Sequence, residues 1–150
     1  MRPSILTASA FILATTALGA CGGVDKTAYV QSVTNVQKKT STDAADRTAD
    51  MAKATTPAAI ATELRDLGAS VESNSVALDK IEAPEEVATL HQNYVDLMAT
   101  FGANLEKLAA DVAKADAKTT NTLLTTAAKL TADLATDESK IVQDINTKLQ

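Results

Sequence analysis

The sequence predicts an all-α protein: an antiparallel helical bundle of four helices in up-down-up-down order. Hydrophobic residues make up 45% of the 150-residue chain, but aromatics are only 3% and tryptophan is absent, so aliphatic residues and alanine carry the apolar content. This composition favours helices, because strands are enriched in aromatic and β-branched residues. The five glycines and three prolines indicate few turns, and therefore a few long helices joined by short connections.

Residues 1–20 are predicted to be an export signal rather than part of the fold. They begin with a basic residue, Arg2, continue with an apolar run from Ile5 to Leu18, and end in small residues. The run is too short and too polar for a membrane-spanning helix, which needs about 20 mostly apolar residues. We therefore predict a signal peptide at 1–20, a tether at 21–24 and a helical bundle domain at 25–150.

The tetrapeptide Leu18-Gly19-Ala20-Cys21 ends the apolar run and contains the only cysteine of the chain. It resembles the lipobox of bacterial lipoproteins, which has a large aliphatic residue, two small residues and a cysteine. The resemblance implies cleavage between Ala20 and Cys21, and attachment of a diacylglyceryl group with palmitate-type chains to Cys21. An ordinary secretory signal followed by an incidental or buried cysteine is the alternative.

A lipid on Cys21 implies a protein that is anchored to a membrane without spanning it. One acyl chain binds only marginally, at about 0.8 kcal/mol per buried methylene, whereas two chains give a stable anchor. Only Gly22, Gly23 and Val24 precede Asp25, and a tether of this length reaches about 10 to 14 Å. The domain is therefore expected close to the cell membrane, on its extracytoplasmic face, or elsewhere in the cell envelope.

The first predicted helix covers residues 25–54, with Asp25 as its N-cap. Thr56 and Pro57 then provide a favourable N-cap and first position for the next helix. The apolar face of the first helix is marked by Tyr29, Val33 and Val36, and more weakly by Ala44, Met51 and Ala52.

The second and third predicted helices form a hairpin around a break at residues 82–84, and Pro84 opens the third. In both helices apolar residues recur at alternating spacings of three and four. One position in each series is polar: Asn74 in the second helix and His91 in the third. In a tight hairpin these two fall in one layer, so we predict that Asn74 and His91 form a structural polar core pair, each satisfying the other's hydrogen bonds. The apolar slots are Ile60, Leu64, Leu67, Val71, Leu78 and Ile81 in the second helix, and Val87, Tyr94, Met98, Phe101, Leu105, Leu108 and Val112 in the third.

The fourth predicted helix carries an apolar face that Asp137 and Glu138 interrupt. The preceding residues, 114–121, include no glycine or proline, so one continuous helix through this segment is the alternative to separate third and fourth helices. The apolar face consists of Leu123, Leu124, Ala127, Leu130, Leu134, Ile141, Val142, Ile145 and Leu149.

His91 is the only histidine, and together with Met98 on the same predicted helix it is a candidate haem or metal ligand. No Cys-x-x-Cys-His sequence is present, and Met98 lies about 10.5 Å along the same helix, too far to share one iron. A structural role for His91 is therefore favoured, and no cofactor is predicted.

Three acidic residues, Asp43, Asp46 and Asp50, share one face of the first predicted helix. Because Arg47 lies among them, a solvated face is a stronger interpretation than a cation site. The sequence also has no combination of nucleophile and base and no glycine-rich phosphate loop that indicates catalysis. We therefore predict no metal site and no enzymatic activity.

The formal net charge of −5 makes nucleic acid an unfavourable partner, since phosphates repel an acidic surface. Together with the predicted anchor, these observations favour a non-enzymatic protein-interaction or envelope module that binds an unidentified envelope protein. The alternative is a carrier that holds a hydrophobic small molecule in a cavity between the helices. Haem or metal binding through His91 is less favoured than either.

Overall fold

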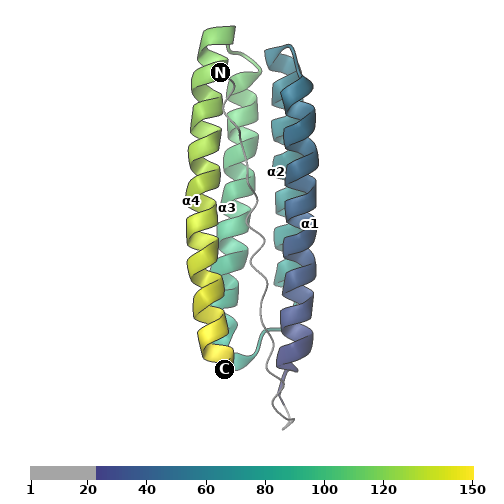
Figure 1. Ribbon diagram of the computed structural model, residues 1–150, viewed down its shortest axis with the longest axis vertical. Coiled ribbons are helices and arrows are strands. Elements are labelled where there is room, and N and C mark those ends of the chain that lie inside the picture. Colours follow the sequence, from purple (N-terminus) through teal and green to yellow (C-terminus); the bar gives the residue numbers. More distant parts are fainter. Residues whose placement is uncertain (1–22) are drawn as a thin grey trace.

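A computed structural model of the protein describes residues 23–150, so the predicted signal peptide and Cys21 lie outside the described residues. The described chain forms an antiparallel bundle of four α-helices without strands, which confirms the predicted fold class (Figure 1). A 3-10 turn, η1, precedes the third helix. The elements are α1 (Lys26–Lys53), α2 (Pro57–Asp79), η1 (Glu85–Val87), α3 (Ala88–Val112) and α4 (Ala117–Leu149).

The first two helices begin at the predicted caps. The Asp25 carboxylate accepts hydrogen bonds from the backbone N–H groups of Thr27 and Ala28, at 2.8 and 3.3 Å. The Thr56 hydroxyl accepts from the N–H of Ala59 at 3.2 Å, and Pro57 takes the first helical position. Both caps satisfy backbone donors that have no partner within the helix.

One helix boundary differs from the sequence prediction, and another decides between the two alternatives that the sequence left open. Pro84 does not open α3 directly, because its carbonyl accepts the N–H of Val87 at 3.0 Å and the chain makes a 3-10 turn before Ala88. The third and fourth helices are separate: Asp116 caps α4 by accepting the N–H of Thr119 at 2.7 Å. An aspartate at this position is a helix-start signal, even though no glycine or proline ends α3.

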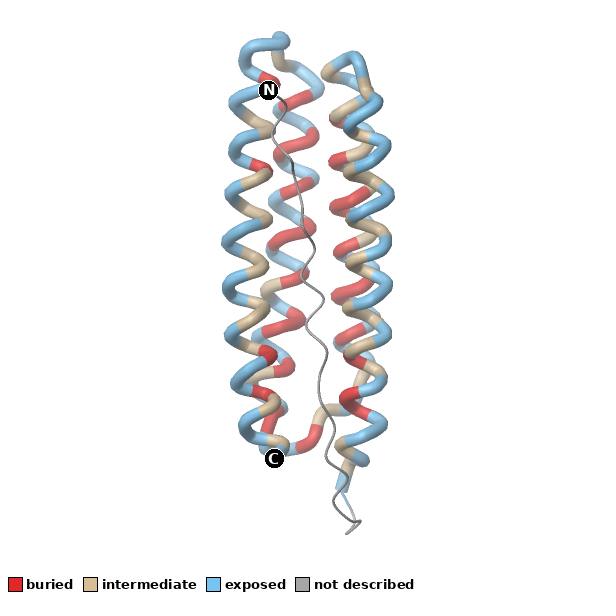
Figure 2. The backbone as a smooth tube through the Cα atoms, in the orientation of Figure 1, coloured by how far each residue is buried: buried red, intermediate tan, exposed pale blue. Residues whose placement is uncertain are grey.

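The core follows the predicted stripes of α2 and α3 (Figure 2). Every apolar position predicted for the third helix is buried, from Val87, which lies in η1, to Val112 of α3. Leu64, Leu67, Val71 and Leu78 of α2 are buried as well. Ile60 and Ile81, at the two ends of the α2 stripe, are half-buried and pack against this core. The alternating spacing therefore predicted which sides of the two helices face each other.

Small residues beside this stripe, including Gly68 and Ser75 of α2 and Gly102 of α3, allow the backbones of the two helices to come close together. A Cβ atom added to Gly102 would lie 3.1 Å from the carbonyl oxygen of Gly68, and one added to Gly68 would lie 3.0 Å from that of Gly102. On one side of this contact the Ser75 hydroxyl donates to the carbonyl of Val95 at 2.9 Å. Only residues without bulky side chains permit this approach, so α2 and α3 form the tight centre of the bundle.

The outer helices are attached less deeply, with α1 packed chiefly on α2 and α4 chiefly on α3. Buried residues of α1 occur only near its start, at Tyr29, Val30 and Val33. Most of the predicted apolar face of α4 is half-buried, with Ala127, Val142 and Ile145 as its buried members. α4 therefore has buried residues toward both of its ends, whereas α1 packs most deeply at the end of the bundle where it begins.

Lys26 joins several elements at that end. Its ammonium group lies 2.7 Å from the Glu86 carboxylate of η1 and donates to the carbonyl of Leu149, near the end of α4, at 3.3 Å. Figure 1 shows the start of α1, the α2–α3 connection and the end of α4 together at this end of the molecule.

Candidate functional site

His91 lies in the core and bonds to two elements other than its own. Its Nε2 is 3.1 Å from the carbonyl oxygen of Leu78, near the end of α2, and its Nδ1 is 3.2 Å from the hydroxyl of Tyr29 on α1. Since a carbonyl can only accept, we assign the hydrogen of the neutral ring to Nε2, and Nδ1 then accepts from the Tyr29 hydroxyl. The ring thus links three helices and has no free ligand position for a metal.

The predicted hydrogen bonding between Asn74 and His91 is wrong, although both side chains are buried, with 2% and 5% of their surface exposed. Helical side chains point toward the N-terminus of their own helix. In an antiparallel hairpin His91 therefore points toward the α2–α3 connection and Asn74 points away from it. Both His91 nitrogens are occupied by Leu78 and Tyr29, and the Asn74 side chain interacts instead with the Asp43 carboxylate of α1, whose pKa it helps to lower.

Acidification is expected to weaken the fold through His91. Burial lowers the pKa of His91 below its ordinary value of 6.5, and the Leu78 carbonyl and Asp79 offset this only in part. Between pH 6.5 and the lower pKa of the folded state, His91 is protonated in the unfolded chain but not in the folded chain. The free energy of unfolding therefore falls as the pH decreases through this range. Urea unfolding of the wild type at pH 7.5 and 5.5 should show this decrease.

The control for this prediction is His91→Leu, which should lose the decrease between pH 7.5 and 5.5. The Asp43 carboxylate does not titrate in this window: burial raises its pKa, but hydrogen bonds from Lys39, Ser70 and Asn74, together with the Lys39 charge, hold the pKa below its ordinary value of 3.8. An equal decrease in the His91→Leu variant would show that His91 is not the responsible group.

A second polar cluster joins α1, α3 and α4. The Tyr94 hydroxyl donates to Oε1 of Glu138 at 2.6 Å, and Nε2 of Gln37 donates to the same oxygen at 3.4 Å. Burial, with the adjacent Glu138 charge, raises the pKa of Tyr94, so its hydroxyl remains a donor at neutral pH. From the sequence, Glu138 was only an interruption of an apolar face, whereas in the structure it joins α4 to α1 through Gln37 and to α3 through Tyr94.

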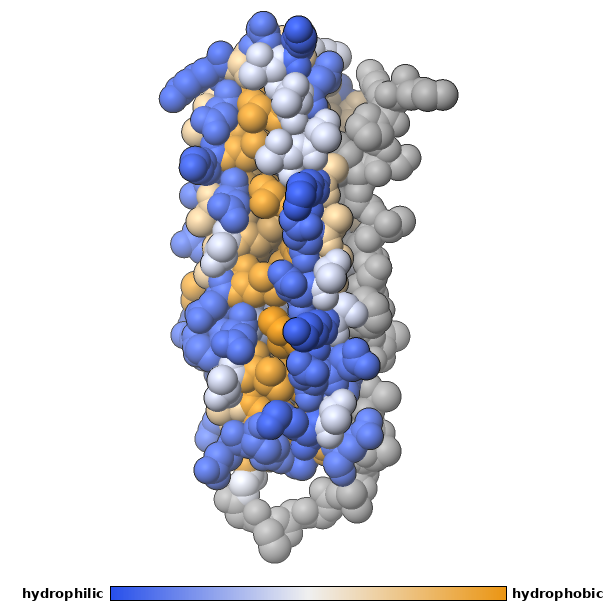
Figure 3. Space-filling model, turned by 90° about the vertical axis from the view of Figure 1, so that its left-hand side faces the viewer, coloured by the Kyte–Doolittle hydropathy of each residue, from blue (hydrophilic) through white to orange (hydrophobic). Residues whose placement is uncertain are grey.

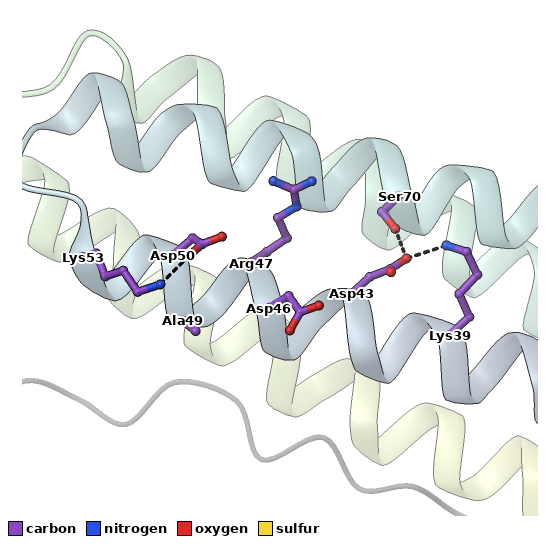
Figure 4. Close-up of a pocket in the computed structure, with 8 residues that line it drawn as sticks. All are labelled: Lys39, Asp43, Asp46, Arg47, Ala49, Asp50, Lys53 and Ser70. Carbon is purple, nitrogen blue, oxygen red and sulfur yellow. Dashed lines mark hydrogen bonds and ion pairs between the residues drawn. The ribbon is translucent and has the colours of Figure 1, made fainter.

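The acidic residues of α1 line a surface pocket of about 620 Å³, and two of the three are ion-paired with lysines (Figure 4). The Asp43 carboxylate accepts from Lys39 at 2.6 Å and from the Ser70 hydroxyl of α2, and Lys53 lies 2.8 Å from Asp50. Arg47 turns to α2, where it contacts Glu63 and Asp66. The solvated-face interpretation therefore describes this region better than a cation site does.

The outer side of the α3–α4 pair carries a groove of about 460 Å³ that sequence analysis missed. Leu90 and Leu97 of α3 and Ile141 of α4 form its apolar part. Figure 3, viewed from the α3 and α4 side, shows a hydrophobic stripe between hydrophilic side chains along this face. The polar lining consists of Asn93, Asp96, Thr100, Asp137, Lys140 and Asp144.

No group of three or more histidine, cysteine, aspartate and glutamate side chains within residues 23–150 is arranged to hold a metal ion. Among the helices of this part of the chain, none has an apolar stretch long enough to cross a bilayer. Comparisons with protein families, curated proteins and solved structures find no match to the chain. A functional proposal therefore rests on the residues themselves.

Proposed function

We propose that the protein is a lipid-anchored, extracytoplasmic module that acts through contacts with another envelope protein and without enzymatic activity. The observation that carries this proposal is the position of Cys21, directly after an apolar segment and four residues before the Asp25 cap. Val24 packs against the core, so the rigid domain begins almost at the proposed anchor. Such spacing suits a domain that is held at a membrane surface.

The proposed anchor gives the bundle a membrane-proximal end. Asp25 begins α1 at the same end as the α2–α3 connection and the end of α4. A tether from Cys21 to Asp25 spans at most about 14 Å. Partners would therefore meet this end, and the adjacent sides of the bundle, within a short distance of the bilayer.

Replacement of Cys21 by serine is expected to move the protein from the membrane fraction to the soluble fraction, or to leave it as an unprocessed precursor. The reason is that only the cysteine thiol can carry the thioether-linked lipid. The measurement is fractionation of cells that express the full-length chain, with metabolic labelling by a palmitate analogue. We expect label in the wild type and none in Cys21→Ser.

Gly23→Ser is the matched control, because it changes a small residue two positions away and keeps the thiol. It should remain labelled and membrane-bound. Membrane retention of Cys21→Ser at its processed size would contradict the anchor. If in-cell crosslinking then enriches no protein, while the purified chain reproducibly contains a hydrophobic small molecule, the carrier function replaces the interaction module.

A further inference from the structure

We infer that the α3–α4 groove binds a lysine- or arginine-rich amphipathic helix of another envelope protein. The inference rests on the proposed function and identifies the surface and the chemistry of the partner.

The floor of the groove has the spacing that a third helix requires. Leu90 and Leu97 are seven residues apart on α3 and lie opposite Ile141 of α4; all three line the groove and are half-buried. Apolar residues seven positions apart on one helix, beside an apolar residue of the next, offer holes for the side chains of a helix that lies along them. At the next two equivalent positions α3 carries Asn104 and Asp111, so the apolar floor is confined to the first half of α3.

The rim of the groove carries more negative than positive charge, and its charged groups form no ion pairs with one another. Asp96, Asp137 and Asp144 line it together with a single cation, Lys140. None of these four residues forms an ion pair with another of the residues 23–150. The α1 pocket differs, because two of its three aspartates, Asp43 and Asp50, already contact lysines. An excess of unpaired carboxylates around an apolar floor complements a helix whose apolar face is flanked by lysine or arginine.

The position of the groove agrees with a membrane-held partner. Residues 90–100 begin just after η1, at the end of the bundle that the proposed anchor brings to the bilayer. At 1.5 Å per residue, the groove occupies roughly the first 20 Å of the bundle from that end. A partner helix near the surface of the same membrane could reach the groove without a long connecting segment.

Site-specific photo-crosslinking in cells tests the inference on the full-length chain. A photoreactive amino acid replaces Leu97 in the groove or, as the matched control, Val76, which is 50% exposed on α2. The expected result is a light-dependent adduct at position 97 and none at 76, with the crosslinked partner segment mapped by mass spectrometry to a basic amphipathic helix. Asn93, exposed at the rim, is a second probe position if the Leu97 variant does not accumulate.

Charge variants provide the second readout. Asp137→Asn with Asp144→Asn should lower the adduct yield about fivefold, because the rim charges guide and retain a cationic helix. The pair Asp46→Asn and Asp50→Asn, which removes the same charge from α1, should leave the yield unchanged.

Several results would overturn the groove inference: no adduct from either groove probe, an adduct with a second copy of this chain, a mapped segment without basic residues, or a yield that is insensitive to Asp137 and Asp144. The proposed function fails separately, through membrane retention of processed Cys21→Ser. A partner that depends on Cys21 but is captured only away from the groove would keep the module and reject the groove.

Discussion

Gly102→Leu is expected to lower the free energy of unfolding by about 3 kcal/mol, one of the largest effects of any single substitution in the bundle. A Cβ atom at this position would lie 3.1 Å from the Gly68 carbonyl oxygen and 3.3 Å from the backbone nitrogen of Glu72. Both neighbours are backbone atoms of α2, so they yield only if the whole helix moves outward. Chemical denaturation followed by circular dichroism measures the loss.

Ala103→Leu is the matched control, since Ala103 is the next residue on α3 and is exposed. It adds the same side chain in the same helix without meeting α2, and should change stability by no more than about 0.5 kcal/mol. Equal stability of Gly102→Leu and Ala103→Leu would mean that α2 and α3 are not held at close approach. Gly68→Leu should resemble Gly102→Leu, because its Cβ would lie 3.0 Å from the Gly102 carbonyl.

The same contact explains why the α2–α3 hairpin was predictable only in part. Large apolar residues at alternating spacings, such as Leu67 and Met98, determine which helix faces meet, and the structure buries them as predicted. How closely the helices approach depends on the smaller residues beside them. Ala61, Gly68 and Ser75 recur every seven positions, and this was the available signal, but it does not stand out among polar and alanine-rich surroundings.

Partners that come from distant elements were the least predictable. His91 bonds to Tyr29, 62 residues away on α1, and Tyr94 bonds to Glu138, 44 residues away on α4. Spacing within one helix identifies the face on which a residue lies, but not which outer helix supplies its partner. The groove was missed for a related reason: Leu90 and Leu97 adjoin the core stripe, and their half-burial depends on how α4 packs.

His91→Leu is expected to cost about 2 to 3 kcal/mol, the second large effect. Leucine fills most of the volume but removes the bond to Leu78 and leaves the buried Tyr29 hydroxyl without its acceptor. The Leu78 carbonyl keeps a bond from the N–H of Ile81, at 2.8 Å, so most of the cost arises at Tyr29. Burial already raises the pKa of Tyr29 to about 12, so the hydroxyl stays protonated and needs an acceptor.

A double-mutant cycle tests this assignment. Tyr29→Phe alone should cost about 1 kcal/mol, and Tyr29→Phe with His91→Leu should cost about 1 kcal/mol less than the sum of the single changes, because both partners are then removed. The companion cycle of Asn74→Leu with His91→Leu should be additive within about 0.5 kcal/mol, since the two side chains point apart. Additivity in the first cycle and coupling in the second would instead restore Asn74 as the partner of His91.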